Sequence, residues 1–435
     1  MRLKINSKKV VKGDTFVSIR DDNKYVMDAI KNGASTVIVK EGRFAVETKI
    51  VENREEYVRK YLEKNYYNEI KDIKLIGITG TNGKTTTSYL IYEAFNKLGI
   101  KCAYIGTLGF YTPDKMIETN NTTPTLYEIY EMLLECKREN IEYVVIEVSS
   151  HGLDMGRVEG LYFEYGIFTN LTEDHLDYHK TMENYAKAKQ KLFKQCKKSI
   201  INIDDKYKDY FFKKDSITYG KNDSDYKISD ININRLGSNF KLNNEEYTCN
   251  LIGEYNVYNV VCVIIILKSL GLDTNIIREL KAPKGRMDII KYKSNSIIID
   301  YAHTPDAVEK ILSEVSKLSH NKIITMIGCG GDRDKYKRPI MGDIATKYSD
   351  YVIFTSDNPR YEDPIDILSD ITCKLYNKNY EIIENRKKAI KKSIQNLSKN
   401  DILLLLGKGH EEYQIIKNEK IYFSDKKEVL KYIRG

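Results

Sequence analysis

KLIGITGTNGKTT, residues Lys74 to Thr86, is the stretch that decides the fold of this 435-residue chain. An apolar run of strand type leads directly into a loop rich in glycine and threonine, and the residues that follow, up to Gly99, have helical spacing. A loop between a buried strand and a helix directs several backbone N–H groups at one point, where they can bind a phosphate. The stretch therefore predicts a nucleotide-binding α/β domain.

The residue types in this loop suit the phosphates of ATP. Gly80 and Gly83 let the backbone approach closely, Lys84 would neutralise the β- and γ-phosphates, and the Thr85 hydroxyl would coordinate Mg²⁺. The strict pattern requires glycine where this chain has Ile78, so the loop matches a shorter variant, and an ordinary surface loop stays open as the alternative. The predicted ATP contacts are Gly80, Thr81, Asn82, Gly83, Lys84, Thr85 and Thr86.

A carboxylate that holds the metal is expected at the end of a neighbouring strand. Glu147 closes the apolar run EYVVIEV and is the best candidate. Taken alone, an acid at a strand end is more often an ordinary loop carboxylate. Its place in the same domain as a phosphate loop favours the metal role.

Strand-like and helix-like segments alternate along the rest of the chain. The N-terminal residues hold the strand-like runs TFVSI (15–19) and STVIV (35–39) around a helical segment, and longer apolar strands continue the alternation toward the C-terminus. This pattern predicts an α/β fold with mainly parallel sheets. Because domains usually hold about 100–200 residues, we expect three. They are a small N-terminal α/β domain at 1–72, a central P-loop ATPase-like domain at 73–282 and a C-terminal Rossmann-like domain at 283–435.

Composition narrows the class of protein. Apolar residues make up 41% and charged residues 30%, and the net charge of +8 comes from lysines that are interleaved with acids. Without a basic block we expect no nucleic-acid partner, and a small anionic substrate fits the charge at least as well. The seven cysteines never form a C-x-x-C pair, and no apolar run reaches the length of a membrane span. We therefore expect a cytoplasmic protein without a zinc site, a disulfide framework or membrane insertion.

Further motifs follow the phosphate loop in order along the chain. They include NTTP (121–124), EVSSHGLDMGRV (147–158), TNLTEDHLDYH (169–179), YAKAKQKLF (185–193), GEYNVYN (253–259), GRMD (285–288), DYAHTPDA (300–307), GCGGDRDKYKRP (328–339), DNPRYEDP (357–364) and GKGHEEYQ (407–414). Together they closely resemble the Mur ligases, and within that family the ligases that add a diamino acid to a UDP-N-acetylmuramoyl-dipeptide in peptidoglycan synthesis. The resemblance covers about residues 74–428.

The resemblance implies an ATP-dependent enzyme of three domains, which bind the uridine end of the substrate, ATP and the incoming amino acid. The γ-phosphate of ATP goes to the terminal carboxylate of D-Glu in UDP-MurNAc-L-Ala-D-Glu, an amine attacks the acyl phosphate, and ADP, phosphate and a new amide result. Phosphorylation supplies a good leaving group, and the tetrahedral oxyanion that follows requires positive charge rather than a protein nucleophile. ATP and Mg²⁺ are the implied cofactors, and we expect a monomer.

The same resemblance assigns roles residue by residue. The catalytic and metal-binding positions are Lys84, Thr85, Glu147, His175 and Lys189, the last as N6-carboxylysine, because a carbamate turns an ammonium into a carboxylate-like anion. The UDP-substrate would contact Ser7, Thr122, Thr123, Ser149 and Arg157, and ATP would also contact Asn259 and His303. The incoming amino acid would contact Arg333, Asp357, Asn358, Pro359, Arg360, Gly407 and Glu411. The first domain departs from the family pattern, and Ser7 and Lys8 stand in for part of a shortened uridine site.

The motif DNPR gives the clearest indication of which amine enters. meso-Diaminopimelate carries a second carboxylate at its far end, which a guanidinium can grip through two parallel hydrogen bonds, whereas the guanidinium would repel the cationic side chain of lysine. Arg360 occupies the deciding position, and in the family DNPR goes with diaminopimelate. LL-diaminopimelate, meso-lanthionine and L-lysine stay open as alternatives.

Two other interpretations remain. A related ligase such as folylpolyglutamate synthase shares the phosphate loop and the carbamate, and DNPR, EVSSHGL and GKGHEEYQ argue against it. The chain could also be a nucleotide-binding switch that forms no bond, and a product assay would separate this hypothesis from the ligase.

Overall fold

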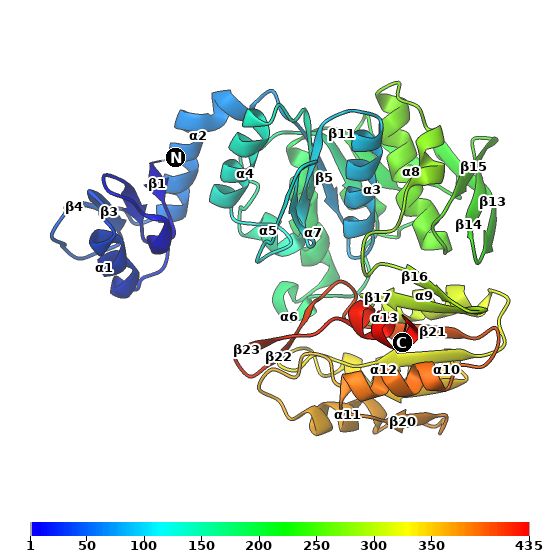
Figure 1. The fold of residues 1–435 in the computed structure, drawn as a ribbon. Coiled ribbons are helices and arrows are strands. Elements are labelled where there is room, and N and C mark those ends of the chain that lie inside the picture. The colour runs from blue at the N-terminus through cyan, green and yellow to red at the C-terminus, as the bar shows by residue number, and fades with distance from the viewer. Residues whose placement is uncertain (1, 435) are drawn as a thin grey trace. The chain divides into compact units, whose positions relative to one another are not determined.

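The computed structural model describes residues 2–434 as an α/β protein with three sheets rich in parallel strands (Figure 1). The chain forms two compact units. One comprises the residues up to Gly77, Ile100–Gly166 and Lys191–Lys197, and the other comprises Ile78–Gly99, Ile167–Gln190 and the residues from Lys198 onward. The α/β class is as predicted, whereas the three-domain boundaries at 72 and 282 stay a prediction.

The N-terminal residues form a four-stranded sheet in which all strands run parallel, in the order β1-β2-β3-β4. The strands are β1 (Leu3–Lys4), β2 (Thr15–Val17), β3 (Thr36–Val39) and β4 (Glu47–Ile50), and the helices are α1 (Asn23–Lys31) and α2 (Arg54–Ile70). Phe16, Val26 and Val37 belong to the small core between α1 and the sheet. The two strands and the helix predicted here are confirmed, and β1, β4 and α2 are additional.

The central sheet has eleven strands in the order β15-β14-β13-β12-β11-β10-β5-β9-β6-β7-β8. Its strands are β5 (Lys74–Thr79), β6 (Cys102–Gly106), β7 (Gly109–Tyr111), β8 (Met116–Ile117), β9 (Tyr143–Glu147), β10 (Phe163–Phe168), β11 (Cys196–Asn202), β12 (Ile217–Gly220), β13 (Tyr226–Asn234), β14 (Gly237–Leu242) and β15 (Glu245–Cys249). Its helices are α3 (Lys84–Lys97), α4 (Leu126–Arg138), α5 (Ser150–Asp154), α6 (Leu176–His179), α7 (Met182–Lys194) and α8 (Glu254–Ser269). The strands β13, β14 and β15 pair antiparallel, as do β6, β7 and β8.

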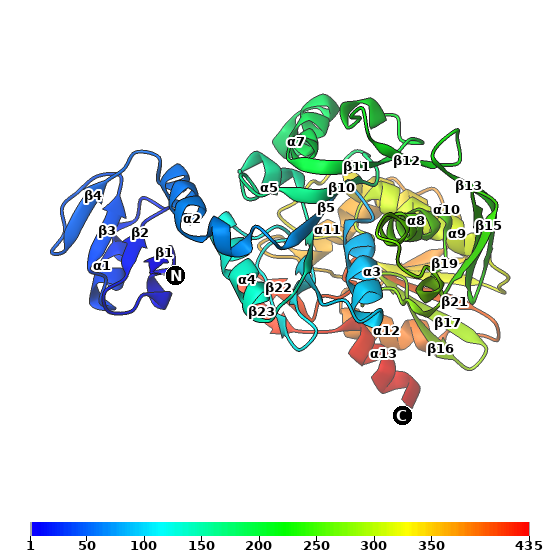
Figure 2. The same cartoon turned by 90° about the horizontal axis from the view of Figure 1, so that it is seen from above.

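The helix α8 is apolar on nearly every side, and its residues from Val260 to Leu267 are buried. A helix of this kind must be covered all round. It packs against α3, the helix of the phosphate loop, and against β13 and β14 (Figure 2). This packing brings Asn259 to the start of α3, where its Oδ1 accepts a hydrogen bond of 3.2 Å from the Thr87 hydroxyl.

The C-terminal residues form a six-stranded sheet in the order β16-β17-β21-β18-β19-β20, parallel except for the edge strand β16. The strands are β16 (Asp288–Tyr292), β17 (Asn295–Asp300), β18 (Ile323–Ile327), β19 (Tyr351–Phe354), β20 (Tyr380–Ile382) and β21 (Ile402–Leu406), and a hairpin of β22 (Tyr413–Ile416) and β23 (Glu419–Tyr422) follows. The helices are α9 (Pro305–Ser316), α10 (Lys337–Tyr348), α11 (Pro364–Thr372), α12 (Arg386–Gln395) and α13 (Asp425–Arg434).

Helices cover both faces of this sheet, which explains the continuous apolar sequence ILLLL of β21. Successive side chains of a strand point to opposite faces. Leu404 therefore packs in the core under α9, α10 and α11, whereas Leu403 and Leu405 pack in the core under α12 and α13. Within residues 2–434, no helix is both long and apolar enough to cross a membrane.

Candidate functional site

The predicted phosphate loop joins β5 to α3 and is held by hydrogen bonds from the end of β10. Thr81 N donates to Asn170 O at 2.8 Å, and Asn82 N donates to Asn170 Oδ1 at 2.9 Å. Glycine is required at Gly80, because a Cβ there would lie 1.9 Å from Thr169 Oγ1. Gly83 is the N-cap residue directly before α3 and has a φ of 86°, a conformation that favours glycine. The loop is thus shaped by its neighbours before any ligand arrives.

Two lysines converge on one carbonyl oxygen of the loop. Lys84 Nζ donates to Gly80 O at 2.9 Å, and Lys189 Nζ, on α7, donates to the same oxygen at 2.8 Å. Lys189 is 1% exposed, and its Nζ lies 4.5 Å from the ring centroid of Tyr185. Burial, and next the charge of Lys84, lower the pKa of Lys189 well below its ordinary value. Burial and the nearby charge of Lys84 therefore both favour the neutral amine of Lys189 over its ammonium form.

A cavity of about 430 Å³ opens beside the phosphate loop. Five of the predicted ATP contacts line it, namely Asn82, Gly83, Thr86, Asn259 and His303, whereas Gly80, Thr81, Lys84 and Thr85 do not. The other side of the cavity is lined by residues from the start of the C-terminal segment (residues 283–435). There Asp306 Oδ2 accepts a hydrogen bond of 2.7 Å from Asn82 Nδ2.

The cavity also reveals Arg286 and Tyr301, to which the sequence interpretation gave no role. The Arg286 guanidinium lies 4.6 Å from the ring centroid of Tyr301, and its Nη2 donates to Thr85 Oγ1 at 3.3 Å. Both residues lie in motifs that were visible in the sequence, GRMD and DYAHTPDA, so their position in the motifs was the available signal. They place a cation and an aromatic face on the wall of the cavity.

The predicted metal ligands come from both compact units, Glu147 from the first and Thr85, His175 and Lys189 from the second. Among residues 2–434, no group of three or more His, Cys, Asp or Glu side chains could hold a metal ion. Glu147 is buried at the end of β9 and accepts hydrogen bonds from Thr107 N at 2.9 Å and from the Tyr104 hydroxyl. His175 is half-exposed, with Nε2 3.4 Å from Asp174 Oδ2. Mg²⁺ usually binds one or two carboxylates and completes its shell with water and phosphate oxygens, so a carboxylate such as that of Glu147 suits it.

Four of the predicted substrate contacts gather around Thr123. Its hydroxyl donates to Glu147 O at 2.8 Å and accepts from Ser149 N at 2.9 Å, while Arg157 Nη1 donates to Thr123 O at 2.9 Å. Thr122 Oγ1 lies 3.0 Å from Thr107 Oγ1. Ser7 lies in the N-terminal part that contains the four-stranded sheet, where its carbonyl oxygen accepts a hydrogen bond of 3.0 Å from Asn32 Nδ2.

The DNPR loop follows β19 and carries Arg360 in a left-handed backbone conformation with a φ of 53°. The Arg360 Nη1 donates to Gly331 O at 2.7 Å. Burial, and next the charge of Arg333, lower the pKa of Arg360 from its ordinary value. Two guanidinium groups that repel one another in this way favour an anionic ligand between them.

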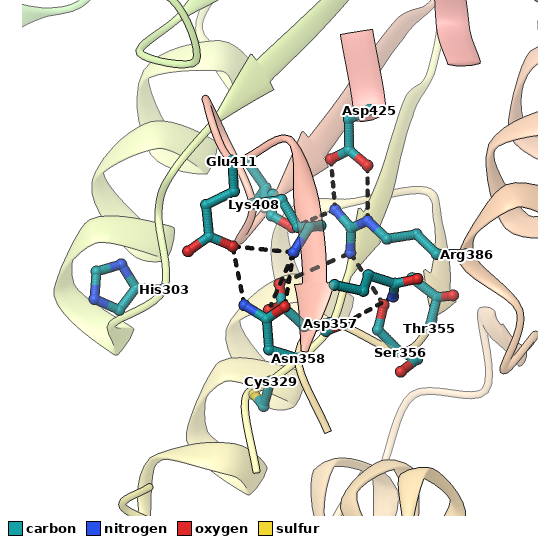
Figure 3. A network of polar contacts seen from close by, with 12 residues as sticks. His303, Cys329, Thr355, Ser356, Asp357, Asn358, Arg386, Lys408, Glu411 and Asp425 are labelled. Atoms are coloured by element: carbon teal, nitrogen blue, oxygen red, sulfur yellow. Dashed lines mark hydrogen bonds and ion pairs between the residues drawn. The ribbon is translucent and has the colours of Figure 1, made fainter. Parts of the chain in front are cut away.

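Three of the other predicted amino-acid contacts, Asp357, Asn358 and Glu411, lie close together in one polar network (Figure 3). Asn358 Nδ2 donates to Glu411 Oε2 at 2.9 Å, and a Cβ at Gly407 would lie 2.8 Å from Asp357 Oδ2. Pro359 is buried, and a Cβ at Gly331 would lie 1.9 Å from its carbonyl oxygen. Sequence interpretation missed three charged residues of this network, which are Lys408, Arg386 and Asp425. Lys408 lies inside GKGHEEYQ, whereas no motif marks the other two.

Family models and known proteins match the chain over most of its length. The Mur ligase middle domain matches residues 78–267, and the Mur ligase glutamate ligase domain matches residues 285–409. The UDP-N-acetylmuramoyl-L-alanyl-D-glutamate–2,6-diaminopimelate ligase of Clostridium perfringens is 42% identical over 459 residues, covering 100% of this chain and 95% of that protein. Its namesake from Aquifex aeolicus is 41% identical over 449 residues, covering 99% and 93%.

Solved structures agree with these matches. A structure of a ligase with the same name is 32% identical, with a TM-score of 0.68, and covers 99% of this chain and 94% of that one. MurF from Thermotoga maritima in complex with ADP is 17% identical with a TM-score of 0.70, covering 99% and 96%, and shows the shared fold alone. The sequence identities, which extend over nearly the whole length, decide the family. The chain belongs to the Mur ligase family.

Proposed function

We propose that this protein is an ATP-dependent ligase that joins meso-2,6-diaminopimelate to the D-Glu carboxylate of UDP-MurNAc-L-Ala-D-Glu. The names of the relatives at 41% and 42% identity support this reaction and these substrates. The intact DNPR motif, with Arg360 beside Arg333, supports a diamino acid with a second carboxylate. LL-diaminopimelate, meso-lanthionine and L-lysine are the competing amines.

The observation that carries the proposal is the pair of lysines on Gly80 O. Lys84 and Lys189 reach the same oxygen at 2.9 and 2.8 Å, from two different helices. In a nucleotide-binding switch, Lys84 would bind phosphate. Such a switch requires no second, buried amine with a lowered pKa, such as Lys189. An enzyme that develops negative charge on a phosphoryl group and on an acyl oxyanion can use both.

The reaction follows from the chemistry of the residues. The loop N–H groups and Lys84 bind the β- and γ-phosphates of ATP and hold the γ-phosphorus toward the D-Glu carboxylate oxygen. That oxygen forms the new P–O bond while the bond to the ADP oxygen breaks. The amine then attacks the acyl carbon, phosphate leaves with its bonding electrons, and the ammonium loses a proton to give the amide.

Thr85 and Glu147 are the residues that would hold Mg²⁺, together with His175 and a carbamylated Lys189. The ion would neutralise charge on the phosphate oxygens. Lys189 as a free amine does not fit a cation site, whereas its carbamate, formed when the neutral amine attacks CO₂, would supply an oxygen ligand. The lowered pKa of Lys189 favours the neutral amine, which is the form that this attack requires.

The remaining assignments complete the proposal. Thr122, Thr123, Ser149 and Arg157 bind the peptide part of the UDP-substrate, and Ser7 and Lys8 contribute to a shortened uridine site. The chain divides functionally into residues 1–72, 73–282 and 283–435, which serve the UDP-substrate, ATP and the amino acid. It acts as a monomer in the cytoplasm, a reducing compartment that suits its seven free cysteines.

A product assay tests this function. The protein is incubated with ATP, Mg²⁺ and UDP-MurNAc-L-Ala-D-Glu, and each of the four amines is offered separately while phosphate release and product mass are measured. Phosphate release that depends on diaminopimelate, with the matching gain in mass, is the expected result. A preference for L-lysine would overturn the role of Arg360, and ATP hydrolysis without any amide would favour the switch.

A further inference from the structure

Lys408 is a completely buried cation between two of the residues proposed to contact the amino acid (Figure 3). Its Nζ donates to Asn358 Oδ1 at 3.0 Å and to Glu411 Oε2 at 3.0 Å. It also lies 3.9 Å from Asp357 Oδ1. Burying the charge of a lysine costs free energy unless the charge is paired, so these polar contacts must offset that cost.

These contacts fix the orientation of Asn358 and Glu411. The Asn358 Oδ1 accepts from both Lys408 Nζ and Ile415 N, each at 3.0 Å, which turns the Asn358 Nδ2 toward Glu411. Glu411 Oε2 accepts from Lys408 and from Asn358, while Oε1 is approached by the Tyr413 hydroxyl at 3.5 Å. Oε1 is therefore the oxygen with capacity left for a donor on a ligand.

The charges around Lys408 are arranged in two layers. Behind it, Arg386 and Asp425 are both 0% exposed and form a bidentate pair, with bonds of 2.8 and 2.7 Å. In front, Lys408 faces the carboxylates of Glu411 and Asp357, and Arg360 follows on the same loop. The rear pair is neutral. The front layer holds Lys408 and Arg360 with the carboxylates of Glu411 and Asp357, and Arg333 beside Arg360 adds a third cation.

We propose that Lys408 is a positioning residue that determines which amine is accepted. It holds the Asn358 amide and the Glu411 carboxylate in place, and its charge offsets one of the two carboxylates of the front layer. A pocket that holds both carboxylates and cations suits the distal ammonium and carboxylate of a diaminopimelate zwitterion. It gives little attraction to the lone ammonium of lysine, which would leave Arg360 unpaired.

This inference rests on the proposed ligase function and makes a separate prediction. Replacing Lys408 by Met removes the charge but keeps the length of the side chain, so Glu411 loses its counter-ion, whereas Asp357 keeps Arg386 at 4.0 Å. The pocket then loses one positive charge, which favours a cationic amine and disfavours a second carboxylate. A lysine with a purely structural role would weaken the binding of both amines alike.

The experiment is a competition assay with the full chain. meso-Diaminopimelate and L-lysine are offered together with ATP, Mg²⁺ and UDP-MurNAc-L-Ala-D-Glu, and the two amide products are separated by mass. For Lys408→Met we expect the KM for diaminopimelate to rise and the product ratio to shift toward lysine, each by about tenfold or more. The KM values for ATP and for the UDP-substrate should remain within about twofold, since Lys408 contacts neither.

Two further variants keep the result interpretable. Lys426→Met is the matched control, because Lys426 on α13 pairs with Asp288 at 2.7 Å, outside the network, and its ratio should equal that of the unaltered protein. Lys408→Gln removes the charge but retains a donor for Asn358, so it should shift the ratio even where Met would disturb packing. An unchanged ratio in both Lys408 variants overturns the inference while the ligase function stands. If the unaltered protein makes no amide, the proposed function fails first.

Discussion

Lys189 combines burial with a single protein acceptor, a combination that proteins rarely give to a lysine. Its Nζ is enclosed by the phosphate loop and the Tyr185 ring and donates to Gly80 O. An ammonium here would be desolvated and would face Lys84, so the neutral amine is favoured, and the lowered pKa follows. A neutral amine is the nucleophile that CO₂ requires. The fold thus supplies the chemical condition for a carbamate at a position where negative charge would balance Lys84.

Replacing Lys189 by Ala should therefore remove ligase activity and permit rescue by small carboxylates. We expect a loss of kcat of about a hundredfold or more, in the range seen when a group that organises transition-state charge is removed. Acetate or formate should restore part of it by occupying the vacated space. Steady-state kinetics with and without acetate measure the effect. Lys187→Ala is the control, since Lys187 lies exposed on the same helix and pairs with Glu183. A Lys189→Ala protein with full activity would exclude the carbamate.

Arg360 carries the prediction about substrate choice. An Arg360→Lys variant keeps the charge but loses the planar fork, so it can make only one of two parallel hydrogen bonds to a carboxylate. A hydrogen bond to a charged group contributes about 1.5–3 kcal/mol, so the KM for diaminopimelate should rise by roughly 10- to 100-fold. Kinetics with varied diaminopimelate check this, with Arg59→Lys on α2 as the control. An unchanged KM would mean that another residue holds the distal carboxylate.

At the scale of elements, two loops of the C-terminal sheet are clamped together. The loop after β18 carries Arg333, and the loop after β19 carries Arg360. Buried Arg338 at the start of α10 joins them, since its Nη1 and Nη2 reach Glu362 at 2.9 Å and its Nη2 reaches Gly330 O at 3.2 Å. The clamp keeps two guanidinium groups near each other in spite of their repulsion.

The clamp predicts a dependence of stability on pH. Hydrogen bonding to Arg338 is the main cause that lowers the pKa of Glu362 from its ordinary 4.5 to about 2. Because the folded pKa is the lower one, the stabilisation is complete above pH 4.5 and is lost as pH falls from 4.5 toward 2. Glu362→Gln should therefore lower the unfolding midpoint at neutral pH and should lose less stability than the unaltered protein across that acid range. Urea unfolding followed at several pH values measures this, with the exposed Glu52→Gln as control. Parallel pH profiles for the two proteins would contradict the clamp.

The elements that could be predicted are those with strong hydrophobic contrast. The runs that became β5, β9, β18 and β21 are mostly apolar, because both faces of their sheets are covered. The hairpin strands were not predicted, since β13 alternates polar and apolar side chains at the surface, β22 is mostly half-buried and β23 is exposed. No periodicity distinguishes such short, half-exposed strands from loops.

The residues of the candidate site also fall into a group that the sequence could predict and a group that it could not. Its motif residues could be named in advance, because each motif is contiguous in the sequence. Arg386 and Asp425 lie 39 residues apart and reach the DNPR loop only through the packing of α12 and α13 against the sheet. Their role is a property of the tertiary fold, and the pattern of a single sequence gives no signal for it.

At the scale of the whole molecule, the cavity beside the phosphate loop is built from widely separated parts of the chain. Asn82 and Gly83 come from the loop, Asn259 from α8, and Arg286 and His303 from the C-terminal segment. The bonds Asn82 to Asp306 and Arg286 to Thr85 join these parts directly. A ligand that fills the cavity would contact all of them. Binding of this ligand would therefore raise the free energy of unfolding of both the loop and the C-terminal segment.

A non-hydrolysable ATP analogue with Mg²⁺ should stabilise the compact unit that contains the cavity, and Arg286 should be needed for the full effect. At a ligand concentration of 100 times Kd, binding to the folded state alone adds about 2.7 kcal/mol. Arg286→Ala removes a cation from the cavity wall and its bond to Thr85, so at the same ligand concentration the gain should shrink by about 1.5 kcal/mol or more. Thermal unfolding with and without the analogue measures both gains. Arg278→Ala, an exposed position on another surface, is the control and should respond like the unaltered protein. Equal gains for all three proteins would show that the analogue binds without Arg286, and the cavity would then not be where the nucleotide sits.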